Sequence, residues 1–154
     1  MKKINKLLKK NLLKEDALPL FQKKNKDIQQ DLNLNLCNFG KLNPKKFFYV
    51  IRRSPGAGLF SNFIYVLNHL DISEQNGFIP IIDMENFTTI YNEKEKIDNT
   101  FNAWEYYFEK INKYSLREVY TSKNVIITSN NFPKSFSHNI ATKKFHKIFD
   151  KYLK

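Results

Sequence analysis

The apolar positions in the middle of the chain form short continuous runs on either side of one long helical pattern. Residues 47–51 and 78–82 are runs of aromatic and β-branched residues, which are typical of strands buried on both faces. Between them, residues 59–76 carry apolar side chains at the spacing of a helix, and Gly77 stands where a helix stop belongs. A proline and two glycines in residues 54–58 indicate a tight turn. This order of elements predicts a βαβ unit with parallel strands joined by a right-handed crossover.

The second half of the chain has weaker patterns. Residues 85–100 have no apolar period and are predicted to form a loop, whereas the aromatic-rich segment 101–113 is predicted to be a helix. Residues 115–118 have the form of a capping box, which indicates the start of a short helix. Residues 125–127 predict a third strand, and the basic, periodic segment from about 140 to 153 predicts a final helix.

These patterns divide the chain into two parts. Residues 1–46 are rich in Lys, Asn, Gln and Asp and have no sustained apolar period after Leu20, so they predict a basic, partly helical extension. Residues 47–154 contain the strand and helix patterns and predict one folded domain, as the length of 154 residues allows. The predicted fold class is α/β, a Rossmann-like three-layer domain with a short parallel sheet.

The charge of the chain invites a nucleic-acid or anionic-surface partner. The net charge is +11, but only three of the 26 basic residues are arginines. Base readout and bidentate phosphate contacts favour the planar guanidinium group over the lysine ammonium. Lysine is abundant together with Asn, Ile and Phe, as in proteins encoded by AT-rich genomes, so much of the charge is explained as solvated surface. No specific nucleic-acid partner is therefore expected.

Cysteine usage and the first residues bear on the cellular compartment. The single cysteine, Cys37, cannot form an internal disulfide, and no His or Cys grouping has the spacing of a zinc site. A cytoplasmic protein without a metal is expected. Lysines interrupt the apolar run that a signal peptide would need. Ile4, Leu8 and Leu12 lie four residues apart, which predicts a basic amphipathic helix. That helix is either solvated or packed on a partner, or makes peripheral contact with the inner face of the membrane.

Candidate ligand-binding residues follow the first predicted strand. In open parallel sheets, ligands bind beyond the carboxyl ends of the strands. Two guanidinium groups, a glycine turn and the positive end of a helix dipole there favour an anion such as the diphosphate of a nucleotide sugar. The segment lacks the G-x-G-x-x-G spacing and the Walker lysine, so it can equally be only a turn. The candidate substrate-binding residues of this segment are Arg52, Arg53, Ser54, Gly56, Gly58 and Asn62.

Further candidates lie downstream. Asp83 and Glu85 leave the second predicted strand and are weak catalytic candidates, suited to accepting a proton or binding sugar hydroxyls. Asp83 has the alternative role of a cap. Trp104 beside Glu105 is a candidate pair for stacking on and hydrogen bonding to a sugar, with burial in the core as the alternative for Trp104. The scattered histidines suggest no catalytic triad.

Four segments, which follow one another in the same order as in a known family, resemble that family. They are IRRSPGAGLFSN at 51–62, IPIIDMENF at 79–87, YNE at 91–93 and NAWEYYF at 102–108. Together these segments resemble the amino-terminal part of bacterial fucosyltransferase-like glycosyltransferases, which are encoded with surface-polysaccharide genes. The resemblance covers roughly residues 47–135.

The resemblance implies one half of a GT-B architecture, in which two Rossmann-like domains face each other across a cleft. Such enzymes need no metal or separate cofactor and transfer a sugar from a nucleotide sugar, typically GDP-fucose, to a glycan acceptor. Gly56, Gly58 and Asn62 are the counterparts of cleft-facing family residues. The second domain of the family carries a His-x-Arg motif that has no counterpart in this sequence. The resemblance therefore implies a truncated transferase that a complementary carboxyl-terminal domain would complete.

Two other functions remain open. One is a basic module that binds nucleic acid or an anionic surface through its lysine-rich ends, with an affinity that falls steeply with salt. The other is a non-catalytic subunit that pairs with a complete transferase.

Overall fold

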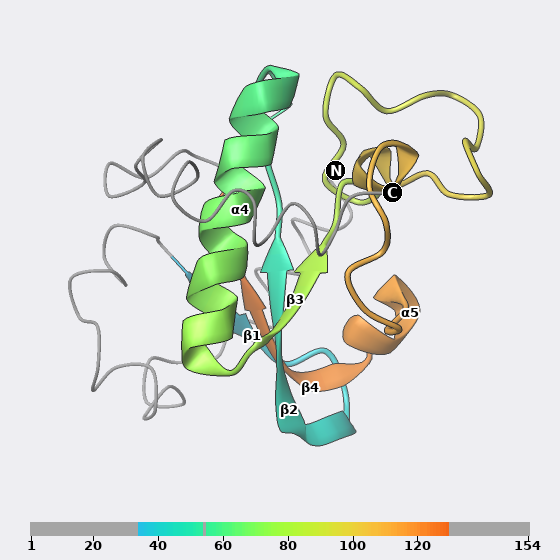
Figure 1. Cartoon of the computed structure of the whole chain (residues 1–154). Coiled ribbons are helices and arrows are strands. Elements are labelled where there is room, and N and C mark those ends of the chain that lie inside the picture. The colour runs from blue at the N-terminus through green and yellow to red at the C-terminus, as the bar shows by residue number, and fades with distance from the viewer. Residues whose placement is uncertain (1–33, 54, 130–154) are drawn as a thin grey trace.

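Four strands form one mixed sheet in the part of the chain that the computed structural model describes, residues 34–53 and 55–129 (Figure 1). The strand order is β1-β4-β2-β3, with β2 parallel to both β3 and β4 and with β1 antiparallel to β4. In chain order the elements are β1 (Asn35–Cys37), β2 (Leu42–Ile51), α4 (Leu59–Asn76), β3 (Ile79–Ile82), the 3₁₀ helix η2 (Ala103–Tyr106), α5 (Leu116–Val119) and β4 (Ser122–Ile127). The predicted α/β class and the parallel pairing of the βαβ unit are confirmed.

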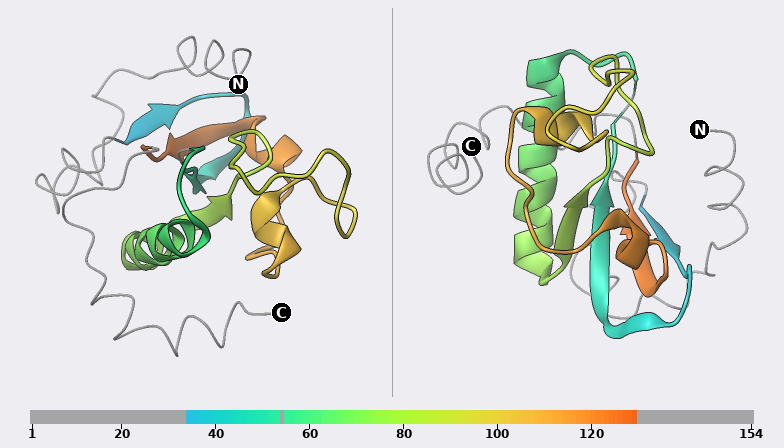
Figure 2. Two further views of the ribbon diagram at one scale, coloured as in Figure 1. Left: turned by 90° about the horizontal axis from the view of Figure 1, so that it is seen from above. Right: turned by 90° about the vertical axis from the view of Figure 1, so that its right-hand side faces the viewer.

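The core lies on both faces of the sheet. Helix α4 runs along one face, and the short helix α5 lies against the other (Figures 1 and 2). Because side chains alternate along a strand, Tyr49 and Ile51 of β2 pack on the α4 side, whereas Phe48 and Val50 pack on the α5 side. All four side chains are fully buried, which explains why this strand is apolar at every position from 48 to 51.

Helix α4 has the bounds that the sequence predicted. It ends at Gly77, whose φ of 67° lies in the left-handed region that favours glycine. The backbone N–H of Gly77 donates to the carbonyl of Glu74, and that of Phe78 donates to the carbonyl of Ser73, so carbonyls of the last turn are satisfied. The chain can therefore turn directly into β3.

Strand β3 lies at the edge of the sheet but offers little for another strand to pair with. Pro80 lacks an N–H group, and its carbonyl accepts a hydrogen bond from the side chain of Asn112. The carbonyl of Ile82 accepts one from the side chain of Asn102 at 2.7 Å. Side chains from residues 102–112 thus cover this edge, as exposed edges of natural sheets require.

The structure differs from the sequence analysis in residues 35–46, which were assigned to the extension. Strand β1 and the first residues of β2 lie there. Leu36 and Cys37 are buried through antiparallel pairing with β4, so the sheet is mixed rather than purely parallel. A three-residue strand is too short to show a period, and Asn43, with a φ of 47°, interrupts the start of β2.

The predicted helix at residues 101–113 is wrong. Only Ala103–Tyr106 is helical, as one turn of 3₁₀ helix capped by the side chain of Asn102. The rings of Trp104 and Phe108 stack with centroids 4.2 Å apart, and the chain then leaves the helical path to cover β3. Tertiary packing of the aromatic side chains therefore overrides the weak helical pattern of this segment.

Other predictions are confirmed. Residues 85–100 contain no helix or strand, and Ser115 and Glu118 form the predicted capping box at the start of α5. The third strand is present and begins earlier than predicted, at Ser122. The predicted helices of the extension and of residues 140–153, and the candidate Ser54, lie outside the described residues.

Candidate functional site

The three parallel strands end at the same edge of the sheet. Strand β2 lies between β3 and β4, both of which follow it in the sequence. The chain therefore leaves β2 toward one side for β3 and returns to the other side for β4. In open α/β sheets, ligands commonly bind at such a switch point, which here lies between the carboxyl ends of β2 and β4. The first residues beyond these two ends are Arg52 and Thr128.

Arg52 is held directly at the switch point. Its backbone N–H donates to Thr128 Oγ1 at 3.1 Å, and its Nε donates to the Thr128 carbonyl at 2.7 Å. The guanidinium carbon lies 4.9 Å from the centroid of the Phe87 ring. Arg52 is half-buried, and burial lowers its pKa from the usual value. The sequence predicted a cationic side chain at the carboxyl edge of the sheet, and the structure confirms that Arg52 lies there.

Arg53 points into the protein instead. It is 6% exposed, its Nη2 donates to Ser61 Oγ at 2.8 Å, and its guanidinium carbon lies 4.6 Å from the centroid of the Tyr65 ring. Burial lowers its pKa. The two guanidinium groups therefore do not act as an exposed pair, and Arg53 ties the turn to helix α4.

The turn after Arg53 is open to the outside. Gly56 and Gly58 are exposed, and a Cβ atom added to either would meet nothing within 4 Å. Neither has a positive φ; Gly58 is extended, at φ −65°. Backbone conformation therefore does not require glycine at either position, whereas close approach from outside is possible at both. We call residues 55–58 the elbow.

The elbow leads into the N-terminus of α4, where the N-cap residue Gly58 has no side chain to cap the helix and the first turn has no acidic residue. The helix dipole there is not offset by local negative charge, so the end favours an anion. The N–H of Leu59 donates to the Tyr91 hydroxyl at 2.7 Å, and the N–H of Ile90 donates to the carbonyl of Pro55 at 3.2 Å. The loop that follows β3 therefore supports the elbow.

The resemblance implied that Asn62 faces a cleft, but the side chain points into the protein. It is 3% exposed, and its Nδ2 donates to the carbonyl of Ala57 at 3.3 Å. Asn62 lies one turn into α4 on the inward-facing side of the helix, and its hydrogen bond to Ala57 stabilises the elbow from inside the protein.

Asp83 is sealed inside the domain. Its carboxylate accepts hydrogen bonds from the backbone and side chain of Asn86, at 2.8 and 3.0 Å, and from the Tyr120 hydroxyl at 2.6 Å. Burial raises its pKa, and these hydrogen bonds oppose the rise. A fully buried carboxylate with satisfied oxygens is a cap of the loop after β3, so Asp83 is corrected from a catalytic candidate to a structural residue.

Glu85, two residues on, is exposed and lies at a pocket beside the outer edge of β3. The pocket has a volume of about 410 Å³, within the range of small-molecule sites. We call it the hollow. Partial burial of its carboxyl group, and then the charges of Asp83 and Glu105, raise the pKa of Glu85. Glu85, Trp104 and Glu105 all line the hollow, so three predicted residues meet there.

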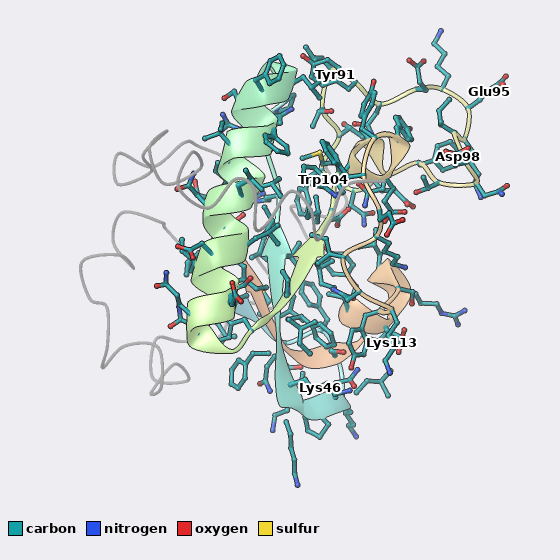
Figure 3. All side chains as sticks on the ribbon, in the orientation of Figure 1. Lys46, Tyr91, Glu95, Asp98, Trp104 and Lys113 are labelled. Carbon is teal, nitrogen blue, oxygen red and sulfur yellow. The ribbon has the colours of Figure 1, made fainter. Side chains whose placement is uncertain are left out.

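Other residues that line the hollow were not among the candidates predicted from the sequence. Those with polar side chains include Asp98, Lys110, Asn112 and Tyr114. Asp98 lies on a loop that extends away from the sheet (Figure 3). No spacing in the sequence brings these positions together, because residues 98–114 are mostly irregular and reach the hollow only by covering the edge of β3.

Trp104 is a core side chain and not an exposed platform for a sugar. It is 5% exposed and stacks with the rings of Phe63 and Phe108, at centroid distances of 6.3 and 4.2 Å. It contributes part of the wall of the hollow, and Glu105 is the more accessible member of the predicted pair.

Residues 34–53 and 55–129 contain no group of three or more His, Cys, Asp or Glu side chains arranged to hold a metal ion. Within the same residues, no helix combines the length and the apolar character needed to cross a membrane.

The fold and the site define a small α/β domain that has a cation and an open elbow at the carboxyl edge of its sheet and a hollow lined by carboxylates beside it. Comparison with protein-family models, curated proteins and solved structures finds no match to this chain.

Proposed function

We propose that this chain is the amino-terminal, Rossmann-like half of a GT-B glycosyltransferase of the fucosyltransferase-like kind. Its substrates would be a nucleotide sugar, such as GDP-fucose, and a glycan acceptor in surface-polysaccharide synthesis. The observation that carries the proposal is the position of Arg52 beside the open elbow. Both lie where β2 ends, and Arg52 is bonded across to the residue that follows β4.

The elbow suits the diphosphate of a nucleotide sugar. Its glycines leave open space where phosphate oxygens could approach the backbone, and the N-terminus of α4, which has no acidic residue in its first turn, favours negative charge. The Nε of Arg52 donates a hydrogen bond to the carbonyl of Thr128, and this bond fixes the direction of the guanidinium group before a ligand binds. A cation held in place in advance loses less entropy when it binds an anion.

The hollow suits the acceptor. Carboxylates are good hydrogen-bond acceptors for sugar hydroxyls, and three of them, Glu85, Asp98 and Glu105, line the same pocket. The raised pKa of Glu85 favours its role as the base that takes the proton from the attacking hydroxyl. The acceptor oxygen would then bond to the anomeric carbon while the bond to the nucleoside diphosphate breaks. Inversion at that carbon would follow.

A complementary carboxyl-terminal domain would supply the rest of the donor site. Proximity and charge stabilisation both need a closed cleft, so the present chain by itself is expected to bind weakly and turn over little. The proposed place of action is the cytoplasm, with peripheral contact at the inner face of the membrane.

A binding titration tests the proposal. The ¹⁵N-labelled chain is titrated with GDP-fucose, GDP-mannose and a random DNA duplex, at about 50 mM and about 300 mM salt. The expected result is a change in the amide signals of Gly56 and Gly58 with a GDP-sugar that persists at the higher salt. Tight duplex binding that is lost at the higher salt would instead support the basic module.

A matched pair of variants locates the binding site. Gly58→Asp places a carboxylate at the N-cap of α4, where it caps the helix but repels a phosphate. Lys123→Gln changes the net charge by the same amount at an exposed position near the start of β4, at the opposite end of the strand from the switch point. We expect Gly58→Asp to weaken GDP-sugar binding at least tenfold and Lys123→Gln to leave it nearly unchanged. Equal losses in both variants would show that only overall charge matters.

A further inference from the structure

Two buried polar atoms in the described structure have no protein hydrogen-bond partner and lie on facing elements. They are Oδ1 of Asn62, in the first turns of α4, and Nε1 of Trp104, in η2. The two side chains are 3% and 5% exposed. Buried polar atoms in native proteins almost always have a partner, either protein or ordered water.

The orientation of the Asn62 amide is supported by its neighbour. Nδ2 donates to the carbonyl of Ala57, and exchanging the amide atoms would place an oxygen against that carbonyl oxygen. Oδ1 is therefore an acceptor that needs a donor. Trp104 Nε1 carries a hydrogen and can only donate. The two atoms are chemically complementary, but the structure records no direct bond between them.

The same small cavity is lined by both side chains. It lies between α4, the loop after β3 and η2, and Thr89 and Tyr91 also contribute to its wall. Its volume of about 10 Å³ is close to the space that one water molecule needs. The two side chains that carry the unpartnered acceptor and donor both line this cavity, and a water needs such polar partners to be held inside a protein.

We propose that one internal water occupies this cavity, accepting a hydrogen bond from Trp104 Nε1 and donating one to Asn62 Oδ1. The water satisfies both atoms and joins the first turns of α4 to η2. Asn62 holds the elbow through Ala57, and Trp104 forms part of the wall of the hollow. The water thus connects the supports of the two candidate ligand surfaces. This inference does not depend on the proposed function.

The experiment uses the full chain labelled with ¹⁵N. Trp104 is the single tryptophan, so the spectrum holds one indole N–H signal. We expect a cross-peak between this proton and water in which the NOE and ROE have opposite signs, the signature of a water held for longer than the protein takes to tumble. The absence of such a cross-peak in the wild-type protein would overturn the proposal, whatever the variants do.

Two variants assign the second partner. Asn62→Leu removes the acceptor, and we expect the cross-peak to be lost. Asn68→Leu is the matched control, because Asn68 is equally buried in the same helix but bonds to the carbonyl of Ile64 and does not line the cavity. A cross-peak that persists in folded Asn62→Leu would refute the bridge, as would its loss in folded Asn68→Leu.

Discussion

His69 is expected to make the stability of the domain fall in mild acid. It lies in α4 and is fully buried, with its Nδ1 2.8 Å from the Tyr49 hydroxyl oxygen and its ring 4.4 Å from that of Tyr65. Burial, and to a smaller extent the charge of Arg53, lower the pKa of His69 from 6.5 to about 3. The folded protein therefore holds this imidazole neutral at pH values where the unfolded chain binds a proton.

The size of the effect follows from the difference between the two pKa values. A lowered pKa gives stability that is fully present above 6.5 and is lost as the pH falls toward about 3, because only the unfolded chain is protonated in that window. The loss is about 1 kcal/mol at pH 5.5 and about 3 kcal/mol at pH 4.5, relative to pH 8. This is a large fraction of the stability of an ordinary small domain.

The variant His69→Gln isolates the effect, because glutamine keeps a polar group near Tyr49 but does not titrate. Urea unfolding of both proteins is followed by the fluorescence of Trp104 at pH 8, 5.5 and 4.5. We expect the variant to be less stable than the wild type at pH 8, and the difference in the free energy of unfolding to shrink by about 3 kcal/mol at pH 4.5. All other titrating groups are common to both proteins. A stability difference that stays constant from pH 8 to pH 4.5 would refute the assignment of a neutral, buried His69.

Other substitutions probe the packing and the charges near the site. Gly40→Ala should destabilise the domain by about 1–3 kcal/mol in urea unfolding, because its Cβ would collide with the backbone carbonyl of Thr121. Gly56→Ala should change stability by less than about 1 kcal/mol, because its Cβ meets nothing, and a large loss there would contradict the open elbow. Tyr120→Phe removes a hydrogen bond that favours ionised Asp83, so the already raised pKa should rise further. Stability tied to a raised carboxyl pKa is lost as the pH rises, so this variant should lose more stability at pH 8 than at pH 4; equal losses would contradict the buried carboxylate.

Several elements could be predicted because short stretches of sequence determine them. The helical period of residues 59–76 and the left-handed position of Gly77 are local properties, and both are present in the structure. The capping box of Ser115 and Glu118 is similarly local. The run before Arg52 is apolar on both faces because that strand lies between two others and is covered on both sides.

The sites were harder to predict, because exposure depends on what the rest of the chain covers. Asp83 and Trp104 have residue types suited to catalysis and sugar stacking, but neighbours distant in the sequence bury both. Tyr120 reaches Asp83 across 37 positions, and Phe63 packs on Trp104 from another element. Glu85 is exposed because it lies two residues beyond Asp83, past the buried part of the loop that follows β3.

The sequence by itself determined the βαβ unit, the end of its helix and the cation at the carboxyl end of its first strand. These depend on periodicity, on backbone preferences of single residues and on the direction of parallel strands. Only the tertiary structure decided that β1 joins the sheet, that Arg53 and Asn62 turn inward, and that a hollow forms beside β3. Burial and cavity shape are set by contacts between distant segments, and no local pattern encodes the sum of those contacts.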